Sequence, residues 1–421
     1  MTASHSVPRF GLIGEKLGHS LSPQIHALLG KYDYQLYPLT REALQSFVCE
    51  GPLSGFNVTI PYKQTVMPWC DELTERARAI GAVNTIVRTK EGKLLGDNTD
   101  YAGFLYQCER SGMNFATKRC AILGSGGASK TVVAVLTDLG AKVQVVSREG
   151  NYTYEDLVRD APTYEAIINT TPVGMFPNLD ASPLNSLEPF TQLEAVLDLI
   201  YNPLETRLLQ LAKKRGLIAQ GGLSMLVMQA IRASERFQGK SLPASLVQTV
   251  LHVIETRTQN IILVGMPGSG KSTLGKKLAQ RLNRPFYDLD DVIRNESGRS
   301  PAQWIEDEGE AYFRDIESLI LTKLTAQHGS VIATGGGSVI RERNRDLMHQ
   351  NGRVVWLQRE LDKLSTHGRP LSQTKGVAQL YAEREPLYRA VSDLIIPVDR
   401  HPETSLARLL ATLDLPEGTL S

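Results

Sequence analysis

Residues 260–273 read NIILVGMPGSGKST, an apolar run that leads straight into a glycine-rich loop. The apolar run predicts a buried strand, and residues 265–272 fit the pattern G-x-x-x-x-G-K-[ST]. Such glycines let backbone N–H groups surround phosphate oxygens at the positive end of the next helix. We therefore predict an ATP site with Mg²⁺, in which Lys271 reaches the β- and γ-phosphates and Ser272 binds the metal. Its residues are Gly265, Gly268, Ser269, Gly270, Lys271, Ser272 and Thr273.

Similar apolar runs recur along the chain and alternate with helical patterns. This alternation is typical of parallel α/β sheets with crossover helices. We therefore predict an α/β fold throughout, with strands at residues 119–124, 142–147, 166–169, 195–199, 260–265, 330–333 and 353–357.

A second glycine-rich turn, GSGGAS at residues 124–129, follows the strand predicted at 119–124. It matches two positions of the dinucleotide-binding pattern G-x-G-x-x-[GA]. The next predicted strand ends at Ser147 and Arg148, where an NAD-binding protein would present Asp or Glu to the ribose 2′-hydroxyl. A small hydroxyl followed by an arginine favours a 2′-phosphate and hence NADP. An ordinary surface charge is the open alternative for Arg148.

The composition is that of ordinary globular domains. The 421 residues are 42% hydrophobic and 22% charged, and at about 150 residues per domain the length indicates two or three domains. Lys and Arg total 46 against 45 Asp and Glu. This balance provides no global field that would attract nucleic acid or an anionic membrane, so a charged substrate must be recognised by a few placed residues.

The cysteines and the lengths of the apolar runs indicate in which cellular compartment the protein is expected. Cys49, Cys70, Cys108 and Cys120 form no C-x-x-C pair, so neither a metal site nor a disulfide framework is expected. No run approaches about 20 apolar residues, and the first residues do not read as a signal peptide. We expect a cytoplasmic protein without a nucleic-acid or membrane partner; these patterns leave its oligomeric state open.

Two carboxylates, Asp288 and Asp290, end a second strand predicted after the ATP loop. Alternation along a strand would put both on one face. There they could hold Mg²⁺ through water and accept a proton from an attacking hydroxyl. An N-cap for a helix beginning at Asp291 is the alternative.

Further motifs follow: Phe313-Arg314, the triplet at residues 335–337, GRPL at residues 368–371 and EREPLY at residues 383–388. Together with the loop and the two carboxylates, they resemble shikimate kinase from residue 258 to residue 421. The resemblance implies a three-layer P-loop domain with a mobile lid, which phosphorylates the shikimate 3-hydroxyl. A gluconate or nucleoside monophosphate kinase is the alternative, and the combined motifs speak against both.

The kinase resemblance also implies roles for single residues. Ser272 and Asp288 would hold the metal, while Asp290 would bind the shikimate hydroxyls and orient the 3-hydroxyl. Lys271 and Arg369 would act on the transferring phosphoryl group, with Arg369 in the lid. The remaining substrate contacts would come from Arg314, Gly335, Gly336, Gly337 and Arg384.

Polar motifs also precede the loop at residues 124–129. They are SLSP at residues 20–23, NVTIPYK at 57–63, AVNT at 82–85 and GDNTD at 96–100. With the later segments NTTPVGM at 169–175, DLIYNP at 198–203 and GLSMLVMQ at 222–229, they resemble shikimate dehydrogenase over most of residues 7–252. The resemblance implies that Lys63 and Asp100 are the catalytic pair. Lys63 would protonate the C3 oxygen of 3-dehydroshikimate, and Asp100 would keep Lys63 charged and oriented.

The same resemblance implies the other contacts of this first module. The substrate hydroxyls and carboxylate would be bound by Ser20, Ser22, Asn57, Thr59, Asn84, Tyr201 and Gln229. NADP(H) would be bound by Gly124, Gly126, Gly127, Ser147, Arg148, Thr170, Met175 and Gly222.

The chain is thus expected to form three domains. A substrate lobe would span residues 1–102 and be completed by a helix at 233–252. A Rossmann-like lobe would span residues 103–232, and the kinase domain residues 258–421. The expected function is NADPH-dependent reduction of 3-dehydroshikimate followed by phosphorylation of shikimate, on the route to chorismate and aromatic amino acids. An NAD-dependent quinate/shikimate dehydrogenase fused to the kinase, or a non-catalytic regulatory protein with both folds, is the alternative.

Overall fold

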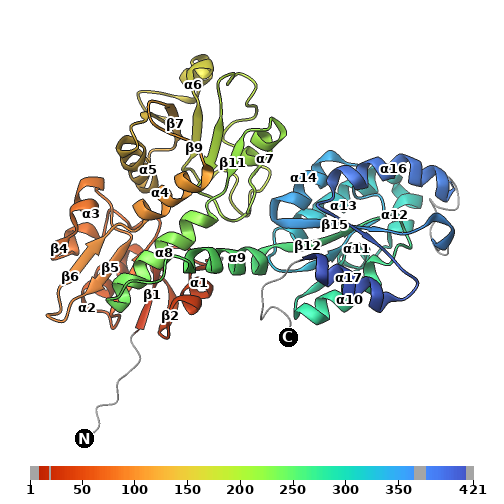
Figure 1. The fold of residues 1–421 in the computed structure, drawn as a ribbon, viewed down its shortest axis with the longest axis horizontal. Helices are drawn as coiled ribbons and strands as arrows, with labels where there is room; N and C mark the ends of the chain where they lie inside the picture. Colours follow the sequence, from red (N-terminus) through yellow and green to blue (C-terminus); the bar gives the residue numbers. More distant parts are fainter. Residues whose placement is uncertain (1–8, 19, 365–375, 414–421) are drawn as a thin grey trace, which may run out of the picture. The chain divides into compact units, whose positions relative to one another are not determined.

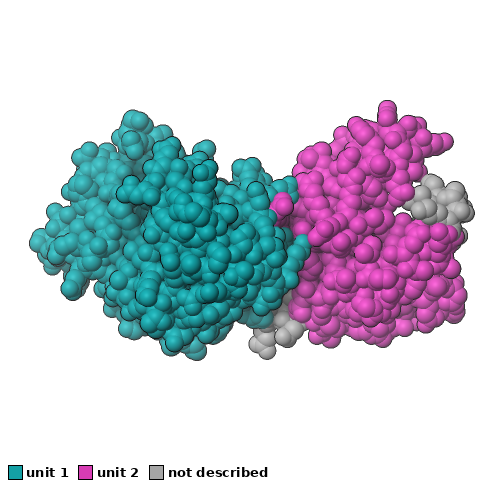
Figure 2. All heavy atoms as spheres, turned by 90° about the horizontal axis from the view of Figure 1, so that it is seen from above, with its two compact units in different colours: residues 1–201, 208–254 teal, residues 202–207, 255–421 magenta. Residues whose placement is uncertain are grey.

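The computed structural model describes residues 9–18, 20–364 and 376–413 and falls into two compact units (Figure 2). Unit 1 comprises residues 1–201 and 208–254, and unit 2 comprises residues 202–207 and 255–421. No helix in the described ranges is both long and apolar enough to cross a bilayer.

The first lobe of unit 1 is built on a mixed six-stranded sheet of order β2-β1-β3-β5-β6-β4. β1 pairs in parallel with β2 and β3, whereas β5 runs antiparallel to β3 and β6. Every residue of β3 is buried, so its polar Asn57 must find partners inside the lobe. The elements are β1 (Arg9–Gly14), α1 (Ser22–Leu29), β2 (Asp33–Pro38), α2 (Arg41–Glu50), β3 (Gly55–Val58), β4 (Glu72–Leu73), α3 (Glu75–Ile80), β5 (Thr85–Arg88) and β6 (Leu94–Asp97).

The second lobe has a fully parallel five-stranded sheet of order β11-β10-β9-β7-β8. The strands predicted at residues 119–124, 142–147, 166–169 and 195–199 are confirmed, each to within one residue. The elements are β7 (Arg119–Leu123), α5 (Gly127–Asp138), β8 (Lys142–Val146), α6 (Tyr154–Arg159), β9 (Ala166–Asn169), β10 (Ala195–Asp198), α7 (Arg207–Lys214) and β11 (Ile218–Gln220).

Two helices join the lobes. The chain passes from the first sheet to the second through α4 (Asp100–Ser111) and returns through α8 (Leu223–Gln238), and these helices pack side by side between the sheets (Figure 1). A Cβ atom on Gly103 of α4 would lie 2.7 Å from the Met225 carbonyl oxygen of α8. The close approach of the two helices therefore depends on a residue without a side chain.

The single helix predicted at residues 233–252 is wrong. α8 ends at Gly239, which adopts φ 62°, and a separate helix α9 (Leu246–Thr258) follows. Glycine adopts this left-handed conformation at no steric cost, and Pro243 next in the connection disfavours helical continuation. The strand predicted to begin at Asn260 is confirmed as β12.

Unit 2 has a parallel five-stranded sheet of order β13-β14-β12-β15-β16, so the first strand lies in the centre. The strands predicted at residues 260–265, 330–333 and 353–357 are confirmed. The elements are β12 (Asn260–Val264), α10 (Lys271–Leu282), β13 (Phe286–Asp288), α11 (Leu289–Ser297), α12 (Pro301–Glu308), α13 (Glu310–Thr325), β14 (Val331–Ala333), α14 (Glu342–Asn351), β15 (Gly352–Gln358), α16 (Val377–Val391), β16 (Leu394–Pro397) and α17 (Pro402–Leu413).

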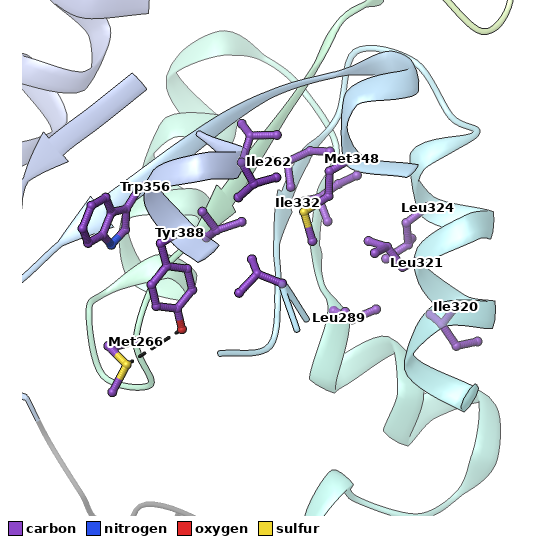
Figure 3. Packing of buried hydrophobic residues seen from close by; sticks show 14 of the residues in the cluster. Ile262, Met266, Leu289, Ile320, Leu321, Leu324, Ile332, Met348, Trp356 and Tyr388 are labelled. Carbon is purple, nitrogen blue, oxygen red and sulfur yellow. Dashed lines mark hydrogen bonds between the residues drawn. The ribbon is translucent and has the colours of Figure 1, made fainter. Parts of the chain in front are cut away.

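The glycine-rich loop of unit 2 is anchored in the apolar core (Figure 3). Met266 lies in this loop and is 3% exposed, and its sulfur lies 3.9 Å from the Tyr388 hydroxyl of α16, which donates to the Gly336 carbonyl. Trp356 of β15 stacks against Tyr388 at 5.9 Å between ring centroids. The loop is therefore fixed by core packing before any ligand arrives.

Replacing Gly103 with valine will separate α4 from α8. A side chain forced against a backbone oxygen costs about 1–3 kcal/mol, more than the few tenths that valine gains over glycine in helix propensity. Urea unfolding followed at unit 1 should show this loss. The matched variant Glu109→Val places the same residue at an exposed position of the same helix and should change stability by about 0.5 kcal/mol at most. Equal stability of the two variants would contradict the assigned close contact.

Candidate active sites

Lys63 and Asp100 form an ion pair in unit 1. Lys63 Nζ donates to Asp100 Oδ2 at 2.6 Å, and the two side chains are 16% and 8% exposed. Lys63 lies in the segment after β3, and Asp100 is the first residue of α4. A carboxylate is stabilised by the helix dipole at this position. The predicted pair is therefore brought together, with enough exposure to reach a ligand.

A buried polar network holds the chain just before Asp100. The Asn84 side-chain oxygen accepts from the Thr99 N–H at 2.7 Å, and the Asn84 amide donates to Thr99 Oγ1 at 3.0 Å. Asn57 joins the network by donating to Thr85 Oγ1 at 3.0 Å. Because unpaired buried polar groups are costly, this network fixes the start of α4.

Tyr34 is a functional candidate that the sequence analysis missed. Its buried hydroxyl donates to Asn57 Oδ1 at 2.7 Å, so Tyr34 helps to position one of the predicted substrate contacts. Two further predicted contacts lie together, because the Ser22 N–H donates to Ser20 Oγ at 3.2 Å. Tyr201 follows β10 of the second lobe and is partly buried. No sequence motif marked Tyr34, because it reads as an ordinary strand residue.

Thr59 and Gln229 complete the predicted substrate contacts. Thr59 follows β3 and packs beside Gly14, whose Cβ would lie 2.5 Å from Thr59 Cγ2. Gln229 is partly exposed on α8, donates to the Leu226 carbonyl at 2.9 Å, and lies across from Gly103 of α4. Both side chains therefore lie on elements adjoining the Lys63–Asp100 pair.

His26 is held inside the first lobe as a neutral packing group. Its ring stacks on Tyr34 at 3.8 Å, and burial lowers the pKa of His26 to about 3. It will not exchange protons near neutral pH, so Lys63 remains the candidate proton donor on this side of the site.

The glycine-rich loop of the second lobe faces Lys63. A Cβ on Gly127 would lie 3.8 Å from Lys63 Cβ. Gly126 is the N-cap of α5 and offers no capping side chain, which leaves the first N–H groups of the helix for an anion. Gly124 adopts φ 107° with Thr170 packed against it, and the Thr170 hydroxyl donates to the Leu123 carbonyl at 2.7 Å. The loop could therefore hold a dinucleotide beside Lys63.

The other predicted cofactor contacts surround this loop. Ser147 and Arg148 follow β8, and Arg148 is exposed near Tyr154. Met175 is 42% exposed. Gly222 begins α8, where a Cβ would lie 2.1 Å from the Leu199 carbonyl oxygen. Gly222 is thus explained by a close backbone approach, which supplies no evidence of a cofactor contact.

The glycine-rich loop of unit 2 has the form expected for phosphate binding. Gly265, Gly268 and Gly270 all adopt positive φ, between 85° and 141°. Lys271, the first residue of α10, donates to the carbonyls of Gly265 and Met266 at 2.8 and 3.0 Å. Its ammonium therefore lies across the loop.

The predicted placement of Asp290 on a strand is wrong. β13 ends at Asp288, and Asp290 lies in the first turn of α11. Asp288 is the N-cap and accepts the Asp290 N–H at 3.1 Å. The helix therefore begins at Leu289 rather than Asp291, because Asp288 supplies the cap.

The oxygen ligands present near the loop suit Mg²⁺. The Ser272 hydroxyl donates to Asp288 Oδ2, so two oxygens lie together at the start of α10. No group of three or more His, Cys, Asp or Glu suited to a metal occurs in the described ranges. Two protein oxygens accord with a Mg²⁺ ion that takes its other ligands from water and phosphate.

The glycine triplet brings the remaining kinase candidates together. A Cβ on Gly335 would lie 3.3 Å from Asp290 Oδ1 and 2.7 Å from Glu317 Oε1, and one on Gly337 would lie 2.2 Å from Arg314 Nη2. A Cβ on Gly336 would contact Pro267 of the phosphate loop at 2.6 Å. Side chains at these positions would fill the space around Asp290.

Two buried arginines retain hydrogen-bonding capacity. Arg314 pairs with Glu317 at 2.8 Å, and Arg384 donates to the Gly336 carbonyl at 3.2 Å. In the described part of the chain neither Nε atom has an acceptor, although both are buried. Unpaired buried donors of this kind indicate an anionic ligand that is planar enough to accept from guanidinium groups.

The sequence analysis did not identify Arg359 as a candidate, and the arginine that it did predict in the lid lies outside the described residues. Arg359 follows β15, donates to the Gly268 carbonyl at 3.4 Å and has a buried Nε without an acceptor among the described residues. It is a candidate phosphate contact that lay outside any motif. Arg369, the predicted lid arginine, lies outside the described residues.

Family comparisons divide the chain in the same order as the sequence motifs. The family model "Shikimate dehydrogenase substrate binding domain" matches residues 12–86, and the model "Shikimate kinase" matches residues 267–414.

Individual relatives match the first part of the chain. A shikimate dehydrogenase (NADP(+)) of Clostridium beijerinckii is 40% identical over 265 residues, covering 58% of this chain and 97% of the relative. The structure of a shikimate 5-dehydrogenase of Thermus thermophilus with NADP(H) and shikimate is 32% identical, with a TM-score of 0.53 over 58% of this chain and 98% of that chain. A quinate dehydrogenase of Corynebacterium glutamicum with NAD is 27% identical, with a TM-score of 0.52 over 58% of this chain and 98% of that chain.

Phosphoryl transfer to shikimate, the acceptor that the kinase match indicates, should weaken in mild acid. Burial, together with Asp288 and Glu317, raises the pKa of Asp290 to about 6. Asp290 is then protonated below about pH 6 and cannot accept a proton, so kcat/KM should fall there. An unshifted aspartate would place this fall near pH 4. The variant Asp291→Asn changes a half-exposed neighbour and should keep the fall near pH 6. A profile flat down to pH 5 would contradict the assignment.

Proposed function

Because the chain belongs to the shikimate dehydrogenase family and also carries a shikimate kinase domain, we propose that one polypeptide catalyses two consecutive reactions. Unit 1 reduces 3-dehydroshikimate to shikimate with NADPH. Unit 2 phosphorylates the 3-hydroxyl of shikimate with ATP and Mg²⁺. The enzyme acts on the route to chorismate and aromatic amino acids, and the four free cysteines accord with a cytoplasmic location.

The observation that carries the dehydrogenase assignment is the Lys63–Asp100 pair beside the Gly127 end of the dinucleotide loop. Gly124, Gly126 and Gly127 would hold the cofactor NADPH, which when bound would supply a hydride to the substrate carbonyl carbon. Lys63 Nζ gives a proton to the carbonyl oxygen, which becomes the hydroxyl, and Asp100 keeps the ammonium aimed at that oxygen. In the reverse direction Lys63 accepts the same proton. Ser20, Ser22 and the Asn57 network hold the substrate carboxylate and hydroxyls.

In unit 2, Arg314 and Arg384 bind the substrate carboxylate through their Nε donors, which have no acceptor among the described residues. Asp290 then accepts a hydrogen bond from the 3-hydroxyl and takes its proton during transfer. Lys271 and the loop N–H groups neutralise charge on the transferring phosphoryl group. Ser272 and Asp288 would hold Mg²⁺, which supplies further charge neutralisation when bound.

One matched pair of variants tests both assignments on the same chain. The wild-type protein with 3-dehydroshikimate, NADPH and Mg-ATP should give shikimate 3-phosphate, identified by mass. Asp100→Asn removes one negative charge with almost no change in side-chain shape, and the rate of 3-dehydroshikimate reduction should fall at least 10²-fold. Shikimate added directly to this variant should still be phosphorylated. Asp290→Asn should stop the sequence at shikimate and leave ATP binding largely unchanged.

Each variant serves as the control for the other. Loss of both activities in either variant would indicate misfolding or shared catalysis rather than two separate sites. Absence of both reactions in the wild type would favour a non-catalytic regulatory protein.

Cofactor choice is tested at Arg148. Arg148 contacts the 2′-phosphate in this proposal, and losing a charge-assisted hydrogen bond costs about 1.5–3 kcal/mol. Arg148→Ala should therefore raise KM for NADPH by roughly 10- to 100-fold and leave KM for NADH nearly unchanged. Arg159→Ala, an exposed arginine of the same lobe, should alter neither. Faster wild-type turnover with NAD and quinate than with NADP and shikimate would support the quinate/shikimate alternative.

A further inference from the structure

A hollow lies in unit 1, apart from the residues assigned to catalysis. Its volume is ≈ 1350 Å³, at or above the size of pockets that enclose small ligands. The residues around it come from the first sheet and its helix α3, from α5 of the second lobe, and from α4 and α8 between them. Figure 1 shows these helices around the junction of the two lobes. Lys63, Asp100 and the predicted substrate contacts are not among its lining residues.

The hollow has apolar side chains on one side and the guanidinium group of Arg76, held against an aromatic ring, on another. Ile80, Leu95 and Leu105 line it, and the Arg76 guanidinium lies flat over the Tyr101 ring at 3.6 Å from its centroid. Tyr101 is itself held, because its hydroxyl donates to Asp138 Oδ2 at 2.6 Å. One face of Arg76 is thus covered by the ring. The Arg76 side chain is otherwise exposed, so a planar acceptor can approach it.

The acidic residues of the hollow are largely engaged with protein partners. Asp97 accepts from Arg236 at 2.8 Å and from the Thr74 hydroxyl at 2.7 Å. Glu235 accepts from Arg232 at 2.8 Å and from the Leu242 N–H at 2.8 Å. Because Asp97 and Glu235 already have protein partners, they give no indication of a bound cation.

The basic residues are less fully engaged. Among the ion pairs of the described ranges, Arg76 and Lys240 have no carboxylate partner. The nearby carboxylates, including the exposed Glu75, would repel a multiply charged anion such as a phosphate. The charge pattern favours a singly charged anion, and the apolar floor favours a ring system.

The hollow also adjoins the catalytic pair through the backbone. Asp97, Asn98 and Thr99 line it, and the next residue is Asp100. Thr99 is the residue held by Asn84 on the substrate side. A ligand that displaces residues 97–99 therefore acts on the carboxylate that orients Lys63.

We propose that this hollow is an effector site for a small planar monocarboxylate, and that its occupancy lowers dehydrogenase activity. The carboxylate binds Arg76, with Lys240 nearby, and the ring lies on the apolar floor. Binding disturbs residues 97–99 and with them the Lys63–Asp100 geometry. The proposal does not depend on which cofactor or substrate unit 1 prefers.

The test uses 2-naphthoate as the probe and the full chain. Calorimetry should detect one binding site in the presence of saturating NADP⁺ and ADP, which occupy the nucleotide sites. Arg76→Glu should weaken binding at least tenfold, because a charge-assisted contact is replaced by repulsion. The control Arg78→Glu makes the same change two residues along α3, at an exposed position outside the hollow, and should alter Kd less than twofold. Ala79→Trp, which fills the hollow from an exposed position, should abolish binding.

Activity supplies the second readout. At a concentration near its wild-type Kd, 2-naphthoate should lower kcat for shikimate oxidation in the wild type and in Arg78→Glu, have little effect in Arg76→Glu, and leave kinase activity unchanged. Purely competitive inhibition against shikimate would place the probe in the catalytic cleft and overturn the proposal. Equal affinity of the two arginine variants would also overturn it, as would binding without any change in kcat.

Discussion

The hydrogen bond from the Thr99 N–H to the Asn84 side-chain oxygen, at 2.7 Å in a buried setting, holds the segment that leads to Asp100, the proposed partner of Lys63 in unit 1. Water cannot replace this bond, so releasing it would leave buried polar groups unpaired at about 1–3 kcal/mol each. The bond fixes the start of α4, and with it Asp100 and the orientation of Lys63. The same short segment borders the hollow proposed as an effector site, and this shared segment is the basis of the proposed coupling.

In unit 2 the equivalent constraint is close backbone approach at the triplet Gly335–Gly337. Any Cβ there would collide with the phosphate loop, with Arg314 or with Glu317. The triplet therefore allows a nucleotide loop, a buried acid and buried arginines to surround one small space. Their proximity also changes the protonation of Asp290. Burial, together with the nearby carboxylates Asp288 and Glu317, raises the pKa of Asp290 to about 6. A group intended to take a proton near neutral pH benefits from that shift.

Strand positions were predictable from sequence because runs such as 119–124 and 260–265 are buried on both faces and hence continuously apolar. The glycine-rich motif likewise located the phosphate loop, and the resemblance to shikimate dehydrogenase singled out Lys63 and Asp100, which form an ion pair in the structure. The predicted boundaries of two helices were wrong, because local capping residues ended a strand or a helix earlier than the sequence pattern indicated. Asp288 caps a helix where strand alternation had been expected to continue, and Gly239 ends α8 where one helix had been expected. Tyr34 and Arg359 were missed because their importance arises from tertiary contacts that no local pattern records.

The two units are expected to bind the substrate carboxylate with different types of side chain. This difference affects how readily each unit releases shikimate. In unit 1 the predicted carboxylate contacts are neutral hydroxyls and amides, which lack the positive charge and the bidentate geometry that an arginine offers to a carboxylate. In unit 2 two buried arginines each leave an Nε donor without an acceptor among the described residues, and a bound carboxylate would satisfy both. Shikimate should therefore be released more readily from unit 1 than from unit 2. With a nearly neutral chain overall, this local contrast, rather than a long-range field, would favour forward passage from reduction to phosphorylation.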